Sequence, residues 1–213
     1  MNASTITKPM LRGHFHQAMF FIALGACVPL ILRSKTSQEW ASTVIYSLCA
    51  LALFGISALY HRVTWSSKKR AIWKKLDHAA IYLMIAGTAT PVAILGLDEI
   101  SGRNFLITIW LVAFVGMFQS IFFVNLPKMV SAVIYLIAGY LILPYISELS
   151  KSIGTANCWF IVAGGIAYSL GALSYGLKRP ILNPKIFSYH EVFHLFVNAG
   201  AIFHFIVINS LIK

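Results

Sequence analysis

The feature that most limits the fold of this sequence is a series of seven apolar segments, most of them near the roughly 20 residues that a bilayer-spanning α-helix needs. Short connections separate these segments and place consecutive helices antiparallel. The sequence therefore predicts an all-α membrane protein, a bundle of seven transmembrane helices. The expected spans are Gln17–Leu32, Trp40–Tyr60, His78–Leu97, Phe105–Leu126, Met129–Ile146, Asn157–Leu177 and His190–Ile212.

Composition supports this class of protein and argues against a soluble one. Only 11% of the 213 residues are charged, whereas soluble domains carry about 25%. A net charge of +11 would suggest nucleic acid in a soluble protein, but here the basic residues lie between apolar segments. We interpret them as anchors on the anionic leaflet of a cell membrane, with lipid and not nucleic acid as partner. The protein is expected to be a multi-pass protein of the cell membrane, the inner membrane if it is bacterial. Cys27, Cys49 and Cys158 are predicted to be buried thiols without disulfides.

The distribution of basic residues predicts the orientation in the membrane. The N-terminus and the connections after the second, fourth and sixth spans hold 12 of the 17 Lys and Arg residues. Cytoplasmic connections carry the excess of basic residues, so we expect a cytoplasmic N-terminus and an outside C-terminus. On this basis residues 1–16 form a short cytoplasmic segment, and residues 17–213 form a single seven-helix domain.

A pair of histidines in the last span predicts a metal site. His190 and His194 are four residues apart, so on a helix their imidazoles lie on one face, one turn apart. Two imidazoles at this spacing commonly bind one ion, most often Zn²⁺. Ionisable groups within a membrane span are costly and usually functional.

The predicted topology brings further polar residues to the same depth as this pair. His61 closes the second span and Asp77 opens the third. Three imidazoles and a water are the usual composition of a reactive zinc site, and zinc lowers the pKa of its water towards ~7. Asp77 could accept the proton of that water or orient the water. Ser57 precedes His61 by one helical turn, so its hydroxyl could stabilise an oxyanion.

Each of these residues also has an ordinary structural explanation. A histidine at the end of a membrane helix is often an interfacial residue. Asp77 could serve simply as the cap of a helix N-terminus. Ser57 could simply be a small residue packed against another helix. His14 and His16 are expected at the same depth in a frayed N-terminal flank, whereas His78 is expected beside the site or facing the headgroups. The convergence of several groups at one depth favours the metal site.

The segment His190–His194 also matches the HExxH signature of soluble zinc proteases, in which the glutamate is the general base. The extended signature places a third histidine at position 200, which is glycine here. His204 lies ten residues after His194, about 15 Å along a helix, and is too distant to share the ion. Glu191 is therefore interpreted as an acid favoured by the start of a helix, pointing away from the metal.

Three segments together resemble the bacterial hemolysin III family. They are Ser57-Ala-Leu-Tyr-His61, Lys75-Leu-Asp77 with the residues up to Pro91, and His190-Glu-Val-Phe-His194 followed by His204. That family belongs with the progestin and adiponectin receptors and, more remotely, the alkaline ceramidases. The resemblance implies zinc held by His61, His190 and His194, with Asp77 at the zinc water and Ser57 nearby. It also implies a cytoplasmic N-terminus. The family usually opens its first span with an acid, an Asn and a His, of which the segment Arg12–Gln17 retains only a His.

Three functions fit these observations. The leading hypothesis is a membrane-embedded, zinc-dependent hydrolase of lipid amide or ester bonds at the cytoplasmic leaflet. The second is a lipid sensor or receptor in which zinc only joins three helices. The third is the cytolytic activity that the family name denotes. Neither the lipid nor the oligomeric state follows from the sequence.

Overall fold

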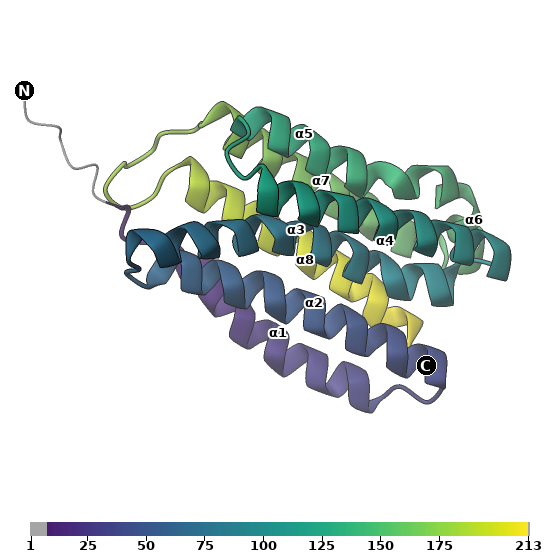
Figure 1. Cartoon of the computed structure of the whole chain (residues 1–213). Coiled ribbons are helices and arrows are strands. Elements are labelled where there is room, and N and C mark those ends of the chain that lie inside the picture. Colours follow the sequence, from purple (N-terminus) through teal and green to yellow (C-terminus); the bar gives the residue numbers. More distant parts are fainter. Residues whose placement is uncertain (1–7, 213) are drawn as a thin grey trace, which may run out of the picture.

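Seven helices that are long and apolar enough to cross a membrane make up most of residues 8–212, the part of the chain that the computed structural model describes (Figure 1). The predicted all-α bundle is thus confirmed. Residues 1–7 of the predicted cytoplasmic segment and Lys213 of the predicted seven-helix domain lie outside the described residues. The helices are α1 (His14–Leu32), α2 (Ser37–Arg62), α3 (Ser67–Gly96), α4 (Glu99–Phe122), α5 (Lys128–Gly139), η1 (Tyr140–Tyr145), α6 (Ile146–Ser152), α7 (Thr155–Leu177) and α8 (Tyr189–Leu211).

Helix α3 begins eleven residues before the expected span, at Ser67. The added stretch holds four Lys, one Arg, one Ala and one Leu, which favour helices, so the helix continues beyond the apolar segment. The stretch expected to be a basic connection is therefore mostly helical. Because Asp77 lies ten residues inside α3, the interpretation of Asp77 as a helix cap was wrong.

The fifth span is interrupted where a continuous helix was expected. Helix α5 ends at Gly139, the 3₁₀-helix η1 follows, and α6 completes the crossing. Pro144 lies inside η1. Proline lacks the backbone donor that an α-helix uses and its ring clashes with the preceding turn, which explains the break.

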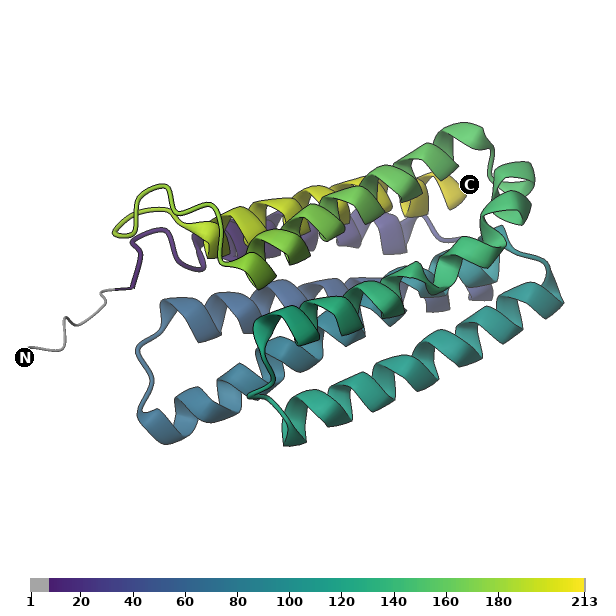
Figure 2. The same cartoon turned by 90° about the horizontal axis from the view of Figure 1, so that it is seen from above.

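Helix α3 lies at the centre of the bundle and is contacted by α2, α4, α5 and α8 (Figures 1 and 2). In its apolar window 67% of the residues are buried, against 17% in the span formed by α5 to α6. Helix α8 packs along α7 and also contacts α1 and α3. Gly116 of α4 lets the ring of Tyr82 of α3 pack against the α4 backbone, because a side-chain carbon at that position would overlap the ring. This arrangement encloses the inner faces of α2, α3, α7 and α8.

Capping groups set where several helices begin. Thr36 and Glu39 form a capping box at the start of α2, which satisfies backbone donors that the first helical turn leaves free. Asp98 accepts hydrogen bonds from the backbone N–H groups of Ser101 and Ile100 at the start of α4. These bonds stabilise the charged form of Asp98 and lower its pKa below the usual value, and the bond from Ser101 contributes most.

The start of α1 and the end of α8 lie at opposite ends of the bundle (Figure 1). We predict that the α1 end is cytoplasmic, because 12 of the 17 basic residues belong to that end. Alkaline phosphatase, which folds only outside the cytoplasm, should be active when fused after Lys213 and inactive when fused in the connection 63–66. The opposite pattern of activities would refute the predicted orientation.

Candidate metal centre

Three buried histidines from two helices meet at the α1 end of the bundle. His61 is in the last turn of α2, and His190 and His194 are in the first two turns of α8. One ring nitrogen from each lies within 4.8 Å of the others. The Nε2 atoms of His61 and His190 are 3.1 Å apart. The side chains that the sequence predicted as metal ligands are therefore brought together, in an arrangement that could hold a metal ion.

The geometry of these nitrogens fits a small cation. Two nitrogens bound at 2.0–2.1 Å in a tetrahedral site are separated by about 3.3 Å, close to the 3.1 Å between His61 and His190. Nδ1 of His194 is buried and has no hydrogen-bond partner within residues 8–212. Buried polar atoms without partners are rare in folded proteins. The residues present thus suit a metal that prefers imidazole ligands.

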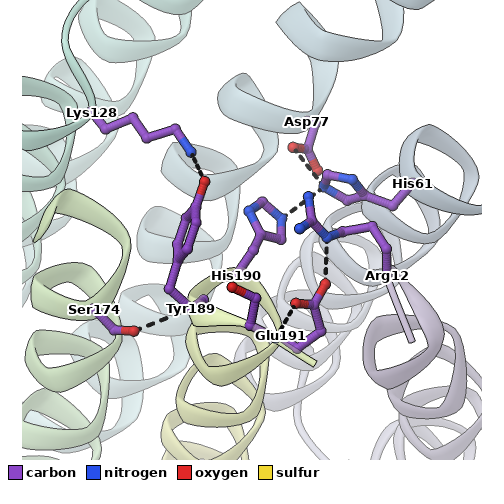
Figure 3. Close-up of polar contacts among 9 residues, drawn as sticks. Arg12, His61, Asp77, Lys128, Ser174, Tyr189, His190 and Glu191 are labelled. Carbon is purple, nitrogen blue, oxygen red and sulfur yellow. Dashed lines mark hydrogen bonds and ion pairs between the residues drawn. The ribbon is translucent and has the colours of Figure 1, made fainter. Parts of the chain in front are cut away.

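Asp77 approaches the same cluster from α3. Its Oδ2 lies 3.7 Å from Nε2 of His61, and its side chain is 14% exposed (Figure 3). Ser57 is buried on α2 one turn before His61, and it lines the same cavity as Asp77. A carboxylate beside the histidines, rather than among them, suits a group that moves a proton.

His16 of α1 was expected in a frayed flank, which was wrong. It is only 2% exposed, and its ring stacks on that of His194 with centroids 3.7 Å apart and planes 2° from parallel. Neither ring nitrogen of His16 has a hydrogen-bond partner in the described part of the chain. No local sequence pattern predicts this contact, because His16 and His194 are distant in the chain.

Glu191 does not face the histidine cluster. It forms a capping box with Ser188 at the start of α8, and its carboxylate makes an ion pair with Arg12 (Figure 3). Glu191 is 1% exposed. A buried carboxylate of this kind needs both partners to offset the loss of its hydration. The arrangement fixes the first turn of α8, which carries His190.

Residues before α1 hold Arg12 in this position. The N–H groups of Met10 and Leu11 donate to the carbonyls of Lys185 and Ile186, at 2.8 and 3.1 Å. Gly13 then adopts a positive φ of 83°, which favours glycine. A side-chain carbon at Gly13 would also lie 2.7 Å from Cβ of His61. The chain can thus pass close to the cluster only with a glycine at this position.

The remaining histidines point elsewhere. His204 is 3.2 Å from the carbonyl of Ile161 on α7, which agrees with its expected distance from the metal ligands. Nδ1 of His78 lies 3.1 Å from the hydroxyl of Tyr135, and His14 contacts Arg62. Cys27, Cys49 and Cys158 are buried and free, as the sequence predicted.

A cavity of about 560 Å³ opens beside the cluster. His61, Asp77, His190 and His194 line its polar end together with four basic side chains, and mostly apolar side chains of α3, α5, α7 and α8 line the rest. Its size is within the range of sites that enclose one small ligand. Tyr140, Leu143 and Ile166 line the cavity and are also exposed on the apolar surface of the bundle. A ligand could therefore enter from the bilayer.

Comparison with known proteins gives a consistent relationship over most of the chain. The sequence profile described as "Haemolysin-III related" matches residues 4–205. The chain is 31% identical to the Hemolysin-3 homolog of Bacillus subtilis (strain 168), over 92% of this chain and 91% of that protein. It is also 31% identical to Hemolysin-3 of Bacillus cereus, over 84% of this chain and 80% of that protein. The human "Monocyte to macrophage differentiation factor" is 28% identical, over 88% of this chain and 79% of that protein.

These matches agree with the resemblance carried by the segments around His61, Asp77 and His190–His194. They also agree with the seven apolar helices, which make this a multi-pass membrane protein. The chain belongs to the haemolysin III family.

Proposed function

We propose that this protein is a zinc-dependent hydrolase of lipid amide or ester bonds that works inside the membrane. The observation that carries the proposal is the place of Asp77, which lies beside three converging imidazoles at the end of a long apolar cavity. A structural site would need no carboxylate beside it and no cavity for a lipid. Zinc is proposed because three imidazoles leave one position open, the usual composition of a catalytic zinc site.

His61, His190 and His194 would hold the zinc ion. When bound, zinc would polarise a carbonyl group and lower the pKa of a water towards ~7. Asp77 takes a proton from the attacking water at its carboxylate, and the hydroxyl of Ser57, which lines the same cavity, stabilises the oxyanion that develops on the carbonyl oxygen. The water oxygen forms a bond to the carbonyl carbon, and the C–N or C–O bond breaks. Asp77 returns the proton to the leaving nitrogen or oxygen, so the products are a fatty acid and an amine or alcohol.

The shape of the bundle supports a lipid substrate. Many large apolar side chains are exposed on the outer surface, as expected of helices that face lipid. Tyr140, Leu143 and Ile166 line the cavity and are also exposed on that surface, so a lipid could pass between them. The predicted orientation would place the histidine cluster in the cytoplasmic leaflet. Acyl chains could then enter laterally while the polar head stays near the membrane surface.

Lipid analysis of membranes tests this proposal. Membranes that contain the wild-type protein, the Asp77→Asn variant or no protein are compared by mass spectrometry. We expect one class of amide or ester lipid to fall, and its fatty acid to rise, only with the wild type. The same lipid composition in all three membranes would contradict the hydrolase and favour a lipid sensor. Release of haemoglobin from erythrocytes by the purified protein, with unchanged lipids, would favour cytolysis.

A further inference from the structure

The cavity beside the histidines is long and mostly apolar. Along α8 it is lined from His190 to Val207, a length of about 25 Å at 1.5 Å per residue. This is most of the ~30 Å thickness of the hydrocarbon core of a bilayer. The far end is formed by side chains such as Val92, Ile142 and Val207. This part suits an acyl chain and has little to offer a polar head.

Four basic side chains line the opposite end of the same cavity. Arg12 comes from the segment before α1, Arg70 and Lys74 come from α3, and Lys128 is the first residue of α5. Arg70 and Lys74 are four residues apart, so they share one face of the helix. Basic residues from three separate parts of the chain thus surround the polar end of the cavity.

Most of these charges are not neutralised by acidic side chains. The amino group of Lys128 donates to the hydroxyl of Tyr189 at 2.9 Å, and that of Lys74 donates to Oδ1 of Asn125 at 2.8 Å. Arg70 lies over the ring of Tyr60, 5.1 Å from its centroid. Among residues 8–212, the ion pairs are Arg12 with Glu191 and His61 with Asp77. Three of the four basic residues therefore have no acidic partner.

The basic residues at this end also act on one another. Burial, and then the nearby charges of Arg70, Arg12 and Arg62, lower the pKa of Lys8 below its usual value. Crowded like charges raise the energy of the folded chain and create a positive potential. An anion bound among them would relieve that repulsion and be held strongly, because arginine pairs with phosphate through two hydrogen bonds at once.

We propose that the cavity binds an amphiphile with a phosphate-bearing headgroup, whose phosphate lies among Arg12, Arg70, Lys74 and Lys128. Its acyl chain fills the apolar part, and the bond to be cleaved lies between them, at the depth of the histidines. This inference rests on the proposed lipid hydrolase and names its substrate class. Phosphate is favoured over carboxylate because it offers more acceptor oxygens and more charge to four basic groups.

Basic residues near a membrane surface also attract the headgroups of the surrounding leaflet. The chain provides a matched control for that effect. Lys68 and Lys69 are on α3 directly before Arg70, are exposed, and do not line the cavity. If leaflet attraction were the only role of these residues, neutralising Lys68 and Lys69 would have the same effect as neutralising Arg70 and Lys74.

The test measures binding of two lipids that cannot be hydrolysed. The purified, zinc-loaded protein in a neutral detergent is titrated with 1-O-hexadecylglycerol 3-phosphate and with 1-O-hexadecylglycerol. We expect the phosphate lipid to bind at least about tenfold more tightly. The double variant Arg70→Gln/Lys74→Gln should lose about tenfold in affinity for the phosphate lipid and none for the neutral lipid. The variant Lys68→Gln/Lys69→Gln should bind both lipids like the wild type.

Equal affinity for the two lipids would overturn this inference, as would the same loss in both double variants. Displacement of the phosphate lipid by inorganic phosphate at equal concentration would also overturn it, since the site would then take free phosphate. Because ether lipids are not cleaved, the result does not depend on turnover. A preference for the phosphate lipid without hydrolysis of any lipid would support this inference and refute the hydrolase. Hydrolysis of a neutral lipid without that preference would support the hydrolase and refute this inference.

Discussion

Replacing His61, His190 or His194 by alanine is expected to remove bound zinc from the purified protein. Wild type should contain one zinc ion per chain, because the three imidazoles converge from α2 and α8. Loss of a direct ligand should weaken binding by more than the 10–100-fold that outer partners typically contribute. A hundredfold loss corresponds to about 2.7 kcal/mol of stability at saturating metal. The midpoint of thermal unfolding should therefore fall by about 5–10 °C.

His204→Ala is the matched control for these variants. His204 is buried on α8 like the predicted ligands, but it contacts the carbonyl of Ile161 on α7. The His204→Ala protein should be less stable because packing contacts are lost, but it should still retain one zinc ion per chain. Elemental analysis of all four variants separates the two effects. Wild-type protein without zinc, or a His61→Ala protein that keeps it, would contradict the proposed ligand set.

Asp77→Asn is expected to lower lipid hydrolysis by about 10²–10⁴-fold, the usual contribution of a general acid–base group. Asparagine has nearly the shape of aspartate but cannot take a proton from water. Zinc binding should weaken by at most about 100-fold, because Asp77 would tune the site without holding the metal. Initial rates with the purified protein at saturating zinc, together with its zinc content, check both parts of the prediction.

Glu191→Gln is the informative comparison, because Glu191 would be the base in a soluble zinc protease. Here Glu191 is paired with Arg12 and caps α8. Glutamine can keep the capping contact but loses the charge, so we expect a loss of about 1–3 kcal/mol of stability. Activity should stay within a few-fold of the wild type. An inactive Glu191→Gln protein beside an active Asp77→Asn protein would reverse our assignment of the base.

Local patterns were enough to predict most of the fold and the approach of three histidines. Seven apolar segments of membrane-spanning length predict seven helices, since a backbone in lipid must satisfy its own hydrogen bonds. The spacing of His190 and His194 places both rings on one face of any helix. Short connections alternate the helix directions, which brings His61 to the depth of this pair. Each of these inferences needs only residues that are near one another in the sequence.

Tertiary structure alone decided which long-range partners complete the site. Arg12 pairs with Glu191 across 179 residues, and His16 stacks on His194. Asp77 lies inside a helix that a hydropathy pattern would begin at residue 78. Such contacts depend on how α1, α3 and α8 pack, and no local periodicity encodes that packing. The sequence by itself determined the helices and the histidine face, whereas the three-dimensional packing determined the buried ion pair, the orientation of Asp77 and the charged end of the cavity.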